Sequence, residues 1–234
     1  MRAKWPKVFP PLSPEQETIR NDFMRLWHQE LPKTYHFVDR WNHRFVAATA
    51  PQTFLRTLDI GAGLGEHLHY EHLSPEQEAN YHALDLRPNM IAELARRFPQ
   101  VSGVVGDCQE RLDFADGTFD RIIAIHVLEH LPNLPVALAE MHRLLSSNGR
   151  LSVVIPCEGG LAYSLARRIS AQRLFEARYK QSYSWFIERE HVNRPDEIFE
   201  ELARYFRVEG RRYFPIPVPV QFLNLCIGLT LCPR

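Results

Sequence analysis

Apolar runs that end in a polar or acidic residue recur through the middle of the chain. Five of them are "TFLRTLDI", "NYHALDL", "VSGVVGD", "FDRIIAI" and "GRLSVVIP", which lie between residues 53 and 156. Several are separated by segments with apolar residues at helical spacing, such as Ile91, Leu94 and Phe98. Near-continuous apolar strands that alternate with helices are typical of a parallel sheet covered on both faces. We therefore predict an α/β fold.

Helical patterns precede and interrupt this alternation. Residues 13–48 are helical in pattern, and residues 157–194 combine apolar residues at helical spacing with a polar, aromatic-rich segment. We expect an N-terminal helical cap at residues 1–50 and one main domain at residues 51–234. In that domain the insert at 157–194 would form a lid, and residues 205–232 would supply the final two strands.

The hexapeptide LSPEQE occurs twice, at residues 12 and 73. Its serine, first-turn proline and glutamine match the start of a helix, with the glutamine side chain reaching back to the cap. Each copy therefore predicts a helix start.

Composition narrows the function classes. The chain has 28 basic and 28 acidic residues, so it lacks the positive charge of a nucleic-acid-binding protein. Its first residues lack the apolar core of a signal peptide, and its four cysteines form no C-x-x-C pair. We expect a reduced, cytoplasmic protein that does not bind nucleic acid.

One segment, Tyr213 to Pro233, carries no charged residue. Pro215, Pro217 and Pro219 exclude a helix over its first half, and the remainder is too short to cross a bilayer. We expect no integral membrane segment. The segment either forms two core strands or exposes a surface that contacts lipid or a lipid-linked substrate.

A glycine-rich turn follows the first predicted strand. Gly61, Gly63 and Gly65 let the backbone turn sharply and approach a ligand closely. A dinucleotide fingerprint would place its third glycine at position 66, where this chain has Glu66. That carboxylate would compete with a pyrophosphate for the backbone amides, so we expect a ligand without a pyrophosphate.

Three acidic residues extend this site. Asp85 ends the second strand, where a carboxylate can accept both hydroxyls of a ribose. Asp107 ends the third strand and could accept from an exocyclic amine, and Asp59 precedes the glycines, where it could meet an ammonium group. A ligand with an ammonium, a ribose and an adenine but no phosphate is S-adenosylmethionine.

These segments, in this order, resemble the class I S-adenosylmethionine-dependent methyltransferases of the type 11 group. The resemblance covers about residues 54–156 and rests on D-x-G-x-G-x-G at 59–65, "ALDLRPNM", "VVGDC" and "FDRIIAIHVLEHLPN". It implies a Rossmann-like, seven-stranded, mostly parallel sheet with helices on both faces and an antiparallel last strand.

The resemblance also implies individual roles for site residues. Gly61, Ala62 and Gly63 would pass under the methionine part of the cofactor. Asp85 would hold the ribose and Leu86 would pack on the adenine. The adenine edge would meet Asp107 and the backbone of Cys108, and His126 would line the methionyl end.

Two other functions remain open at this point. A nicotinamide-dependent oxidoreductase could use a related sheet, although Glu66 argues against it. A non-catalytic protein could keep the cofactor pocket and act as a binding partner.

The stretch "IHVLEHLP" at residues 125–132 contains H-x-x-E-H, an inverted zinc-protease pattern. Such a site needs a long helix, but here a strand runs to Ile125 and Pro132 follows. Certain methyltransferases that act on vicinal hydroxyls resemble this stretch and bind a divalent cation. The corresponding ligands here would be His126, Glu129, His130 and His191. We assign no metal and expect His130 or His191 to take a proton from the acceptor.

The acceptor is expected to be a small molecule that receives the methyl group on oxygen or nitrogen. Residues 161–190 contain six basic and three acidic residues, with aromatic residues among them. They form either a solvated helix face or, through Arg167 and Arg168, a lid for a sugar or another anionic metabolite. His67, His69 and His72 are expected to lie on a solvated helix face.

Overall fold

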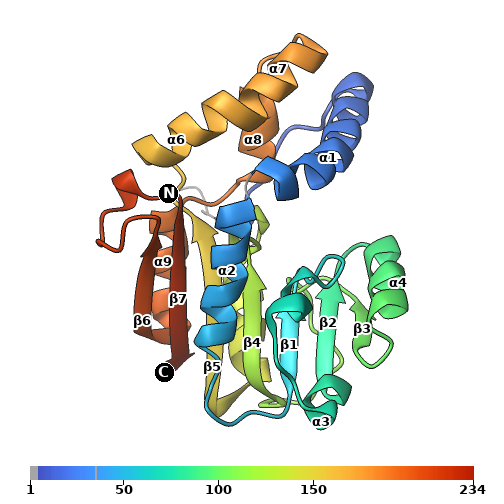
Figure 1. Ribbon diagram of the computed structural model, residues 1–234, viewed down its shortest axis with the longest axis vertical. Coiled ribbons are helices and arrows are strands. Elements are labelled where there is room, and N and C mark those ends of the chain that lie inside the picture. Colours follow the sequence, from blue (N-terminus) through green and yellow to red (C-terminus); the bar gives the residue numbers. More distant parts are fainter. Residues whose placement is uncertain (1–4, 35) are drawn as a thin grey trace.

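In the computed structural model, one seven-stranded sheet forms the centre of the molecule (Figure 1). The structure describes residues 5–34 and 36–234, without the side chains of residues 27–34. Its strands are β1 (Thr57–Ile60), β2 (Tyr81–Asp85), β3 (Ser102–Val105), β4 (Phe119–Ile125), β5 (Leu145–Pro156), β6 (Phe206–Phe214) and β7 (Cys226–Pro233).

The strand order is β3-β2-β1-β4-β5-β7-β6. Strand β7 runs antiparallel to β5 and β6, and the other neighbouring pairs are parallel. The α/β, Rossmann-like fold with an antiparallel last strand is therefore confirmed.

Helices cover both faces of the sheet. They are α1 (Pro14–Thr34), α2 (His36–Ala48), η1 (Glu66–Tyr70), α3 (Pro75–Ala79), α4 (Pro88–Arg97), η2 (Leu128–His130), α5 (Leu134–Leu144), α6 (Leu161–Arg167), η3 (Arg168–Gln172), α7 (Arg173–Tyr179), α8 (Ser184–Glu190), α9 (Pro195–Tyr205) and η4 (Gln221–Leu223). Helices α5 and α9 pack on one face through the main core, and α2 and α4 pack on the other. Successive strand residues face opposite sides. Leu58 and Ile60 therefore enter the main core, whereas Asp59 between them does not.

Both LSPEQE segments begin a helix, as predicted. At α1 the Ser13 backbone amide donates to the Gln16 side chain, and the Gln16 amide donates to the Ser13 hydroxyl. Ser74 and Gln77 make the same reciprocal pair at α3. Each pair satisfies two amides that would otherwise have no partner within the helix.

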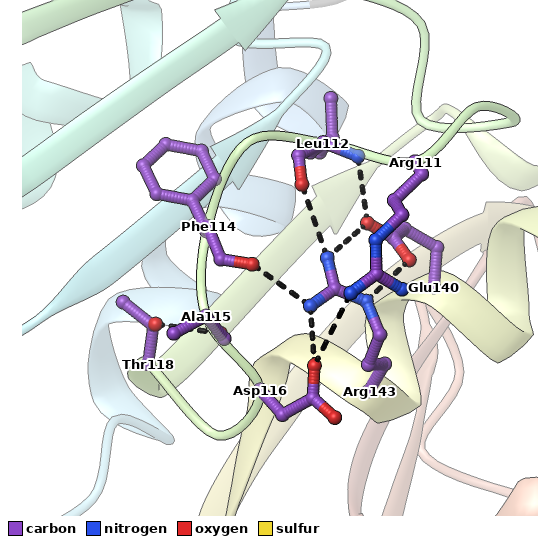
Figure 2. A network of polar contacts seen from close by, with 8 residues as sticks. All are labelled: Arg111, Leu112, Phe114, Ala115, Asp116, Thr118, Glu140 and Arg143. Carbon is purple, nitrogen blue, oxygen red and sulfur yellow. Dashed lines mark hydrogen bonds and ion pairs between the residues drawn. The ribbon is translucent and has the colours of Figure 1, made fainter.

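A polar network fixes the loop at residues 111–118 to α5 (Figure 2). The Arg143 guanidinium donates to the backbone oxygens of Leu112 (3.1 Å) and Phe114 (2.8 Å) and to both oxygens of Glu140. Glu140 in turn accepts from the Leu112 amide at 2.8 Å. The network holds the loop between β3 and β4, which follows the predicted adenine-binding residues.

A second, smaller core joins the N-terminal helix to the insert. It contains six buried residues from α1 and from the segment at 171–186: Ile19, Phe23, Ala171, Phe175, Tyr183 and Phe186. The Phe23 ring lies 5.0 Å from the rings of both Phe175 and Phe186. Figure 1 shows α1 and α6–α8 above the carboxyl ends of the parallel strands. We call this assembly of α1 and residues 157–194 the cap.

The structure corrects the expectation for His67 and shows how the uncharged segment after Tyr213 folds. His67 is buried at 2% exposure and contacts Glu71 at 2.6 Å, so its placement on a solvated face was wrong; His69 and His72 are exposed. The sequence pattern could not show that α2 covers this side of η1.

The uncharged segment divides into a buried strand, β7, and an exposed connection at 215–223. Among the described residues no helix is long and apolar enough to cross a membrane.

Candidate cofactor and acceptor site

The turn after β1 has the backbone geometry that its glycines predict. Gly61, Gly63 and Gly65 have φ angles of 71°, 57° and 85°, which side-chain-bearing residues rarely adopt. A Cβ at Gly61 would lie 2.6 Å from Val127, and one at Gly65 would lie 2.6 Å from the Phe98 ring. The turn therefore needs glycine for both conformation and space.

Glu66 caps this turn instead of leaving its amides open. Its carboxylate accepts from the Leu64 amide at 3.0 Å. The expected competition between Glu66 and a pyrophosphate thus has a structural basis, because the side chain already occupies one of the amides.

Asp85 lies at the end of β2, directly beside the turn. Its carboxylate accepts from the Gly63 amide at 3.1 Å and from the Arg87 amide and guanidinium at 2.9 Å. Burial raises the pKa of Asp85, but these hydrogen bonds outweigh it and lower the pKa, so the carboxylate is ionised. The neighbouring Leu86 is 66% exposed and presents an apolar surface at the same edge.

Asp107 and Cys108 follow β3 at that edge. The Asp107 carboxylate accepts from the backbone amide of Gln109 at 2.8 Å and from its side chain at 3.1 Å. Cys108 is buried at 6% exposure, and burial raises the pKa of its thiol to about 12. The side chain of Cys108 is therefore an inert packing group, and its backbone is the part that can meet a ligand.

Asp59 lies deeper than the other predicted residues. It is 3% exposed, accepts from the Tyr81 hydroxyl at 2.8 Å, and has its pKa raised by burial. Ala62, in the turn itself, is buried against β2 and α4. Asp59 thus braces the strand beneath the turn, and its carboxylate is occupied by Tyr81.

His126 occupies an unusual backbone position at the end of β4. Its φ angle is 54°, in the left-handed region that few non-glycine residues adopt. The Asn42 amide nitrogen lies 2.9 Å from its Nε2, and a Glu129 oxygen lies 2.9 Å from its Nδ1. Because Asn42 donates to Nε2, Nδ1 carries the proton and donates to Glu129. Because both ring nitrogens of His126 are hydrogen-bonded, the ring has no free lone pair with which to act as a base.

His130 and His191 lie side by side, with ring centroids 5.0 Å apart. The Nδ1 of His130 is 2.6 Å from the backbone oxygen of Glu190, and the Nδ1 of His191 is 2.9 Å from a Glu158 carboxylate oxygen. Both partners are acceptors, so each Nδ1 carries a proton, and in its neutral form each ring has its lone pair on Nε2. Burial lowers the pKa of His130, which favours the neutral ring.

Glu129 joins this group from the same turn, η2. It is fully buried, yet its Oε2 has no hydrogen-bond partner among the described residues. Burial opposes its ionisation, but the hydrogen bond from His126 and the neighbouring histidines lower its pKa to about 2. Glu129, His130 and His191 each offer one ligand atom, and these atoms lie within 4.8 Å of one another.

A cavity of about 320 Å³ opens beside these residues. His126, Glu129, His130 and His191 line one wall, and β7 contributes Cys226. The remaining walls come from α1, α2 and the insert and are mostly apolar, with Phe23, Met24, Val38, Tyr163, Ala166, Phe186 and Ile187 among them. The N-terminal helices and the insert therefore enclose it together. Of the residues predicted to bind the cofactor, His126 is the one that also lines this cavity.

Three residues of the candidate site were not identified from the sequence. Asn42 reaches His126 from α2, where no motif marks it. Glu158 lies two residues after the end of β5, so its place near a strand end could have identified it. Arg87 was quoted only as part of "ALDLRPNM", and its side chain pairs with Asp85.

The arginines of the insert point in different directions. Arg167 lines the cavity but pairs with Glu158, and its guanidinium lies over the Tyr163 ring. Arg168 is exposed to solvent. Only Arg167 is thus placed to face a bound acceptor.

Several known proteins with similar sequences are methyltransferases. Residues 58–153 match a family model described as a methyltransferase domain. A ubiquinone/menaquinone biosynthesis C-methyltransferase from Dinoroseobacter shibae is 31% identical over 49% of this chain and 47% of its own length. The chain therefore spans about half of that relative. The protein named "Probable phthiotriol/phenolphthiotriol dimycocerosates methyltransferase 2" from Mycobacterium ulcerans is 27% identical over 76% of this chain and 74% of its own length.

A solved structure shows the same fold. The Burkholderia thailandensis 1,6-didemethyltoxoflavin-N1-methyltransferase, crystallised with bound 1,6-didemethyltoxoflavin and S-adenosylhomocysteine, has a TM-score of 0.58 and 22% identity. The match covers 97% of this chain and 93% of that one. The match to the methyltransferase domain thus covers the glycine turn and the strands from β1 to β5, and in these segments the chain resembles the class I S-adenosylmethionine-dependent methyltransferases.

Proposed function

We propose that the protein transfers the methyl group of S-adenosylmethionine to a hydroxyl group of a small, largely apolar molecule held in the cavity. The observation that carries the acceptor assignment is the orientation of His130 and His191. Both rings have Nδ1 bound to an acceptor and leave the Nε2 lone pair for a proton, next to the wall formed by His126.

The edge at β1, β2 and β3 fits the cofactor. Gly61 and Gly63 carry no side chains of their own in the turn, Asp85 is an ionised acceptor beside it, and Leu86 is an exposed apolar surface. Asp107 and the backbone of Cys108 would meet the adenine edge. When bound there, S-adenosylmethionine supplies an electrophilic methyl group on a positively charged sulfur.

The chain's own residues would then position and deprotonate the acceptor. The apolar walls from Phe23, Tyr163 and Phe186 exclude water and fix the body of the molecule. His191, whose Nδ1–H donates to Glu158, would accept the hydroxyl proton at Nε2, and Glu158 stabilises the imidazolium that results. His130 lies beside it and is kept neutral by burial, so it can serve the same purpose.

The cavity favours a neutral acceptor over an anion. Its one arginine, Arg167, pairs with Glu158, and Glu129 and Glu190 contribute negative charge to the wall. A sugar phosphate or another anionic metabolite would have to displace Glu158 from Arg167. The related quinone-pathway enzyme is a C-methyltransferase, so an activated ring carbon is the other acceptor atom to test.

The experiment is a methyl-transfer assay with isotopically labelled S-adenosylmethionine and four matched acceptors. These are a hydroxylated aromatic compound, its amine analogue, a quinol with an open ring carbon, and a sugar phosphate. Product analysis identifies the methylated atom. Turnover of the hydroxylated compound is expected, whereas selective turnover of the sugar phosphate or the amine would contradict the acceptor assignment.

A divalent cation at Glu129, His130 and His191 is the second candidate arrangement. The buried Glu129 Oε2, which has no partner among the described residues, favours it. In that case the two histidines would hold the cation and would not act as bases.

A further inference from the structure

Large exposed apolar side chains gather along α6 of the cap and along the neighbouring connection from β6 to β7. Eight of the fourteen that are exposed in the described part of the chain come from two segments. They are Leu161, Leu165 and Ile169 on α6 and η3, and Ile216, Val218, Val220, Phe222 and Leu223 in the connection from β6 to β7. Their exposures range from 39% to 64%. We call these eight residues the apolar face.

The two segments adjoin each other. The Gln221 side chain donates to the Glu158 backbone oxygen at 3.1 Å, next to the start of α6. A Cβ on Gly160 would lie 2.9 Å from the Gln221 backbone oxygen and 3.3 Å from the Phe222 Cα. In Figure 1 the red connection lies beside α6. The two parts of the apolar face therefore adjoin where α6 begins, and exposed apolar surface of this kind marks an interaction site.

The connection is held firmly in this exposed form. Asn224 is fully buried, accepts from the Ile216 amide at 2.7 Å, and donates to the backbone oxygens of Val218 and Val220. A buried asparagine that ties three backbone groups fixes the path of the loop. Its apolar side chains consequently point to solvent because the fold holds them there.

The two segments that carry the apolar face contain arginine but no acidic residue. Residues 159–175 contain Arg167, Arg168 and Arg173 and no acidic residue, and residues 210–233 contain Arg211 and Arg212 and no acidic residue. All but Arg167 are exposed. A two-fold pairing of this surface with a second copy would bring like charges together. Apolar side chains bordered by arginine instead complement a lipid surface with negative headgroups.

We propose that the apolar face docks the protein on the surface of an anionic lipid bilayer. Leu165 and Phe222 enter the boundary between headgroups and acyl chains, while Arg168 and Arg173 remain at the headgroups. The opposite side of α6 supplies Tyr163, Ala166 and Arg167 to the acceptor cavity. A docked molecule would therefore hold that cavity close to the bilayer. The docking itself does not depend on methyl transfer.

The test is sedimentation of the full chain with vesicles, in the absence of any methyl donor. One set contains phosphatidylcholine alone and the other contains phosphatidylcholine with phosphatidylglycerol. Binding to the anionic vesicles is expected, with weakening in high salt. The double variant Leu165→Glu/Phe222→Glu should bind at least about tenfold more weakly, and so should Arg168→Glu/Arg173→Glu. Val136→Glu, an exposed apolar position on α5, is the matched control and should bind like the parent.

Three results would overturn the proposal. One is absence of binding by the parent chain, and another is equal binding by the Leu165→Glu/Phe222→Glu variant. The third is a dimer, seen by light scattering without lipid, that this variant converts to a monomer; the apolar face would then belong to a second copy. Circular dichroism of each variant ensures that a loss of binding is not a loss of folding.

Discussion

The carboxylate of Asp85 is held by the guanidinium of Arg87, which donates at 2.9 Å and 3.0 Å to its two oxygens. These are the oxygens that ribose hydroxyls would use. Replacing Arg87 by alanine should therefore tighten S-adenosylhomocysteine binding by about two- to fivefold, the worth of a partly exposed ion pair. Asp85→Ala should weaken binding by about tenfold or more. Isothermal titration calorimetry measures both, and weaker binding by Arg87→Ala would mean that the arginine contacts the ligand itself.

The Glu158–His191 pair predicts an ordered series of activities. His191→Ala should lower kcat by about 100-fold because it removes a proton acceptor. Glu158→Gln should lower kcat less, since it leaves the ring but weakens support for the imidazolium. His72→Ala, which changes an exposed histidine that does not line the cavity, is the control. A steady-state assay across pH measures all three, and an unchanged kcat in His191→Ala would assign the base to another group.

The cluster of Glu129, His130 and His191 makes metal dependence testable. If the histidines act as bases, dialysis against a chelator should leave activity unchanged, and calorimetry with Zn²⁺ or Mn²⁺ should show no site. Metal binding by the parent chain that disappears in Glu129→Gln would establish the cation arrangement instead. The calorimetric measurement of metal binding requires no knowledge of the natural acceptor.

Glu71 links stability to pH. Burial opposes its ionisation, but the hydrogen bond from His67 and the charge of Arg121 lower its pKa from 4.5 to about 2. A carboxyl with a lowered pKa stabilises the fold above pH 4.5, and this contribution is lost as the pH falls toward 2. At neutral pH, the ionised carboxylate of Glu71 contributes about 3 kcal/mol to the free energy of unfolding. Glu71→Gln should thus be clearly less stable than the parent at pH 7 but much closer to it at pH 3.

Urea unfolding at both pH values measures this difference. Glu76→Gln, which changes an exposed glutamate on α3, is the matched control. A gap between parent and Glu71→Gln that stays constant from pH 7 to pH 3 would show that Glu71 stabilises by packing and not by charge.

The network in Figure 2 predicts unequal roles for two arginines. Arg143 donates to two backbone oxygens and to Glu140, with 14% of its side chain exposed, whereas Arg111 is 73% exposed and lies 3.8 Å from Asp116. Arg143→Ala should lower the free energy of unfolding by about 1–3 kcal/mol, and Arg111→Ala by less than about 0.5 kcal/mol. Equal effects in thermal unfolding would contradict this assignment.

Much of the fold could be predicted because its signals are local. The strand end at Asp85, the glycine turn and both helix caps follow from spacing alone, whereas the third strand ends at Val105, two residues before the predicted Asp107. Even the extent of the fourth strand, to Ile125, matched the structure. Each of these features depends on neighbours within a few residues.

The parts that could not be predicted depend on contacts between distant segments. His67 is buried because α2 lies over it, 24 residues earlier in the chain at His43. Asn42 meets His126 across 84 residues, and the orientation of His191 depends on Glu158. The uncharged stretch after Tyr213 was ambiguous because composition does not distinguish a buried strand from a rigid exposed loop.

The small core around Phe23 and Phe175 is separate from the core of the sheet. The two segments of the cap are joined by that cluster and by ion pairs at its edge, such as Arg20 with Glu190 at 2.5 Å. Local opening of a protein can involve one cooperative unit while the rest stays folded. Amide hydrogens of α1 and α7 would then exchange with solvent much faster than those of β4 and β5. The acceptor could enter and the product leave through brief unfolding events in the cap, at no cost to the sheet that holds the cofactor.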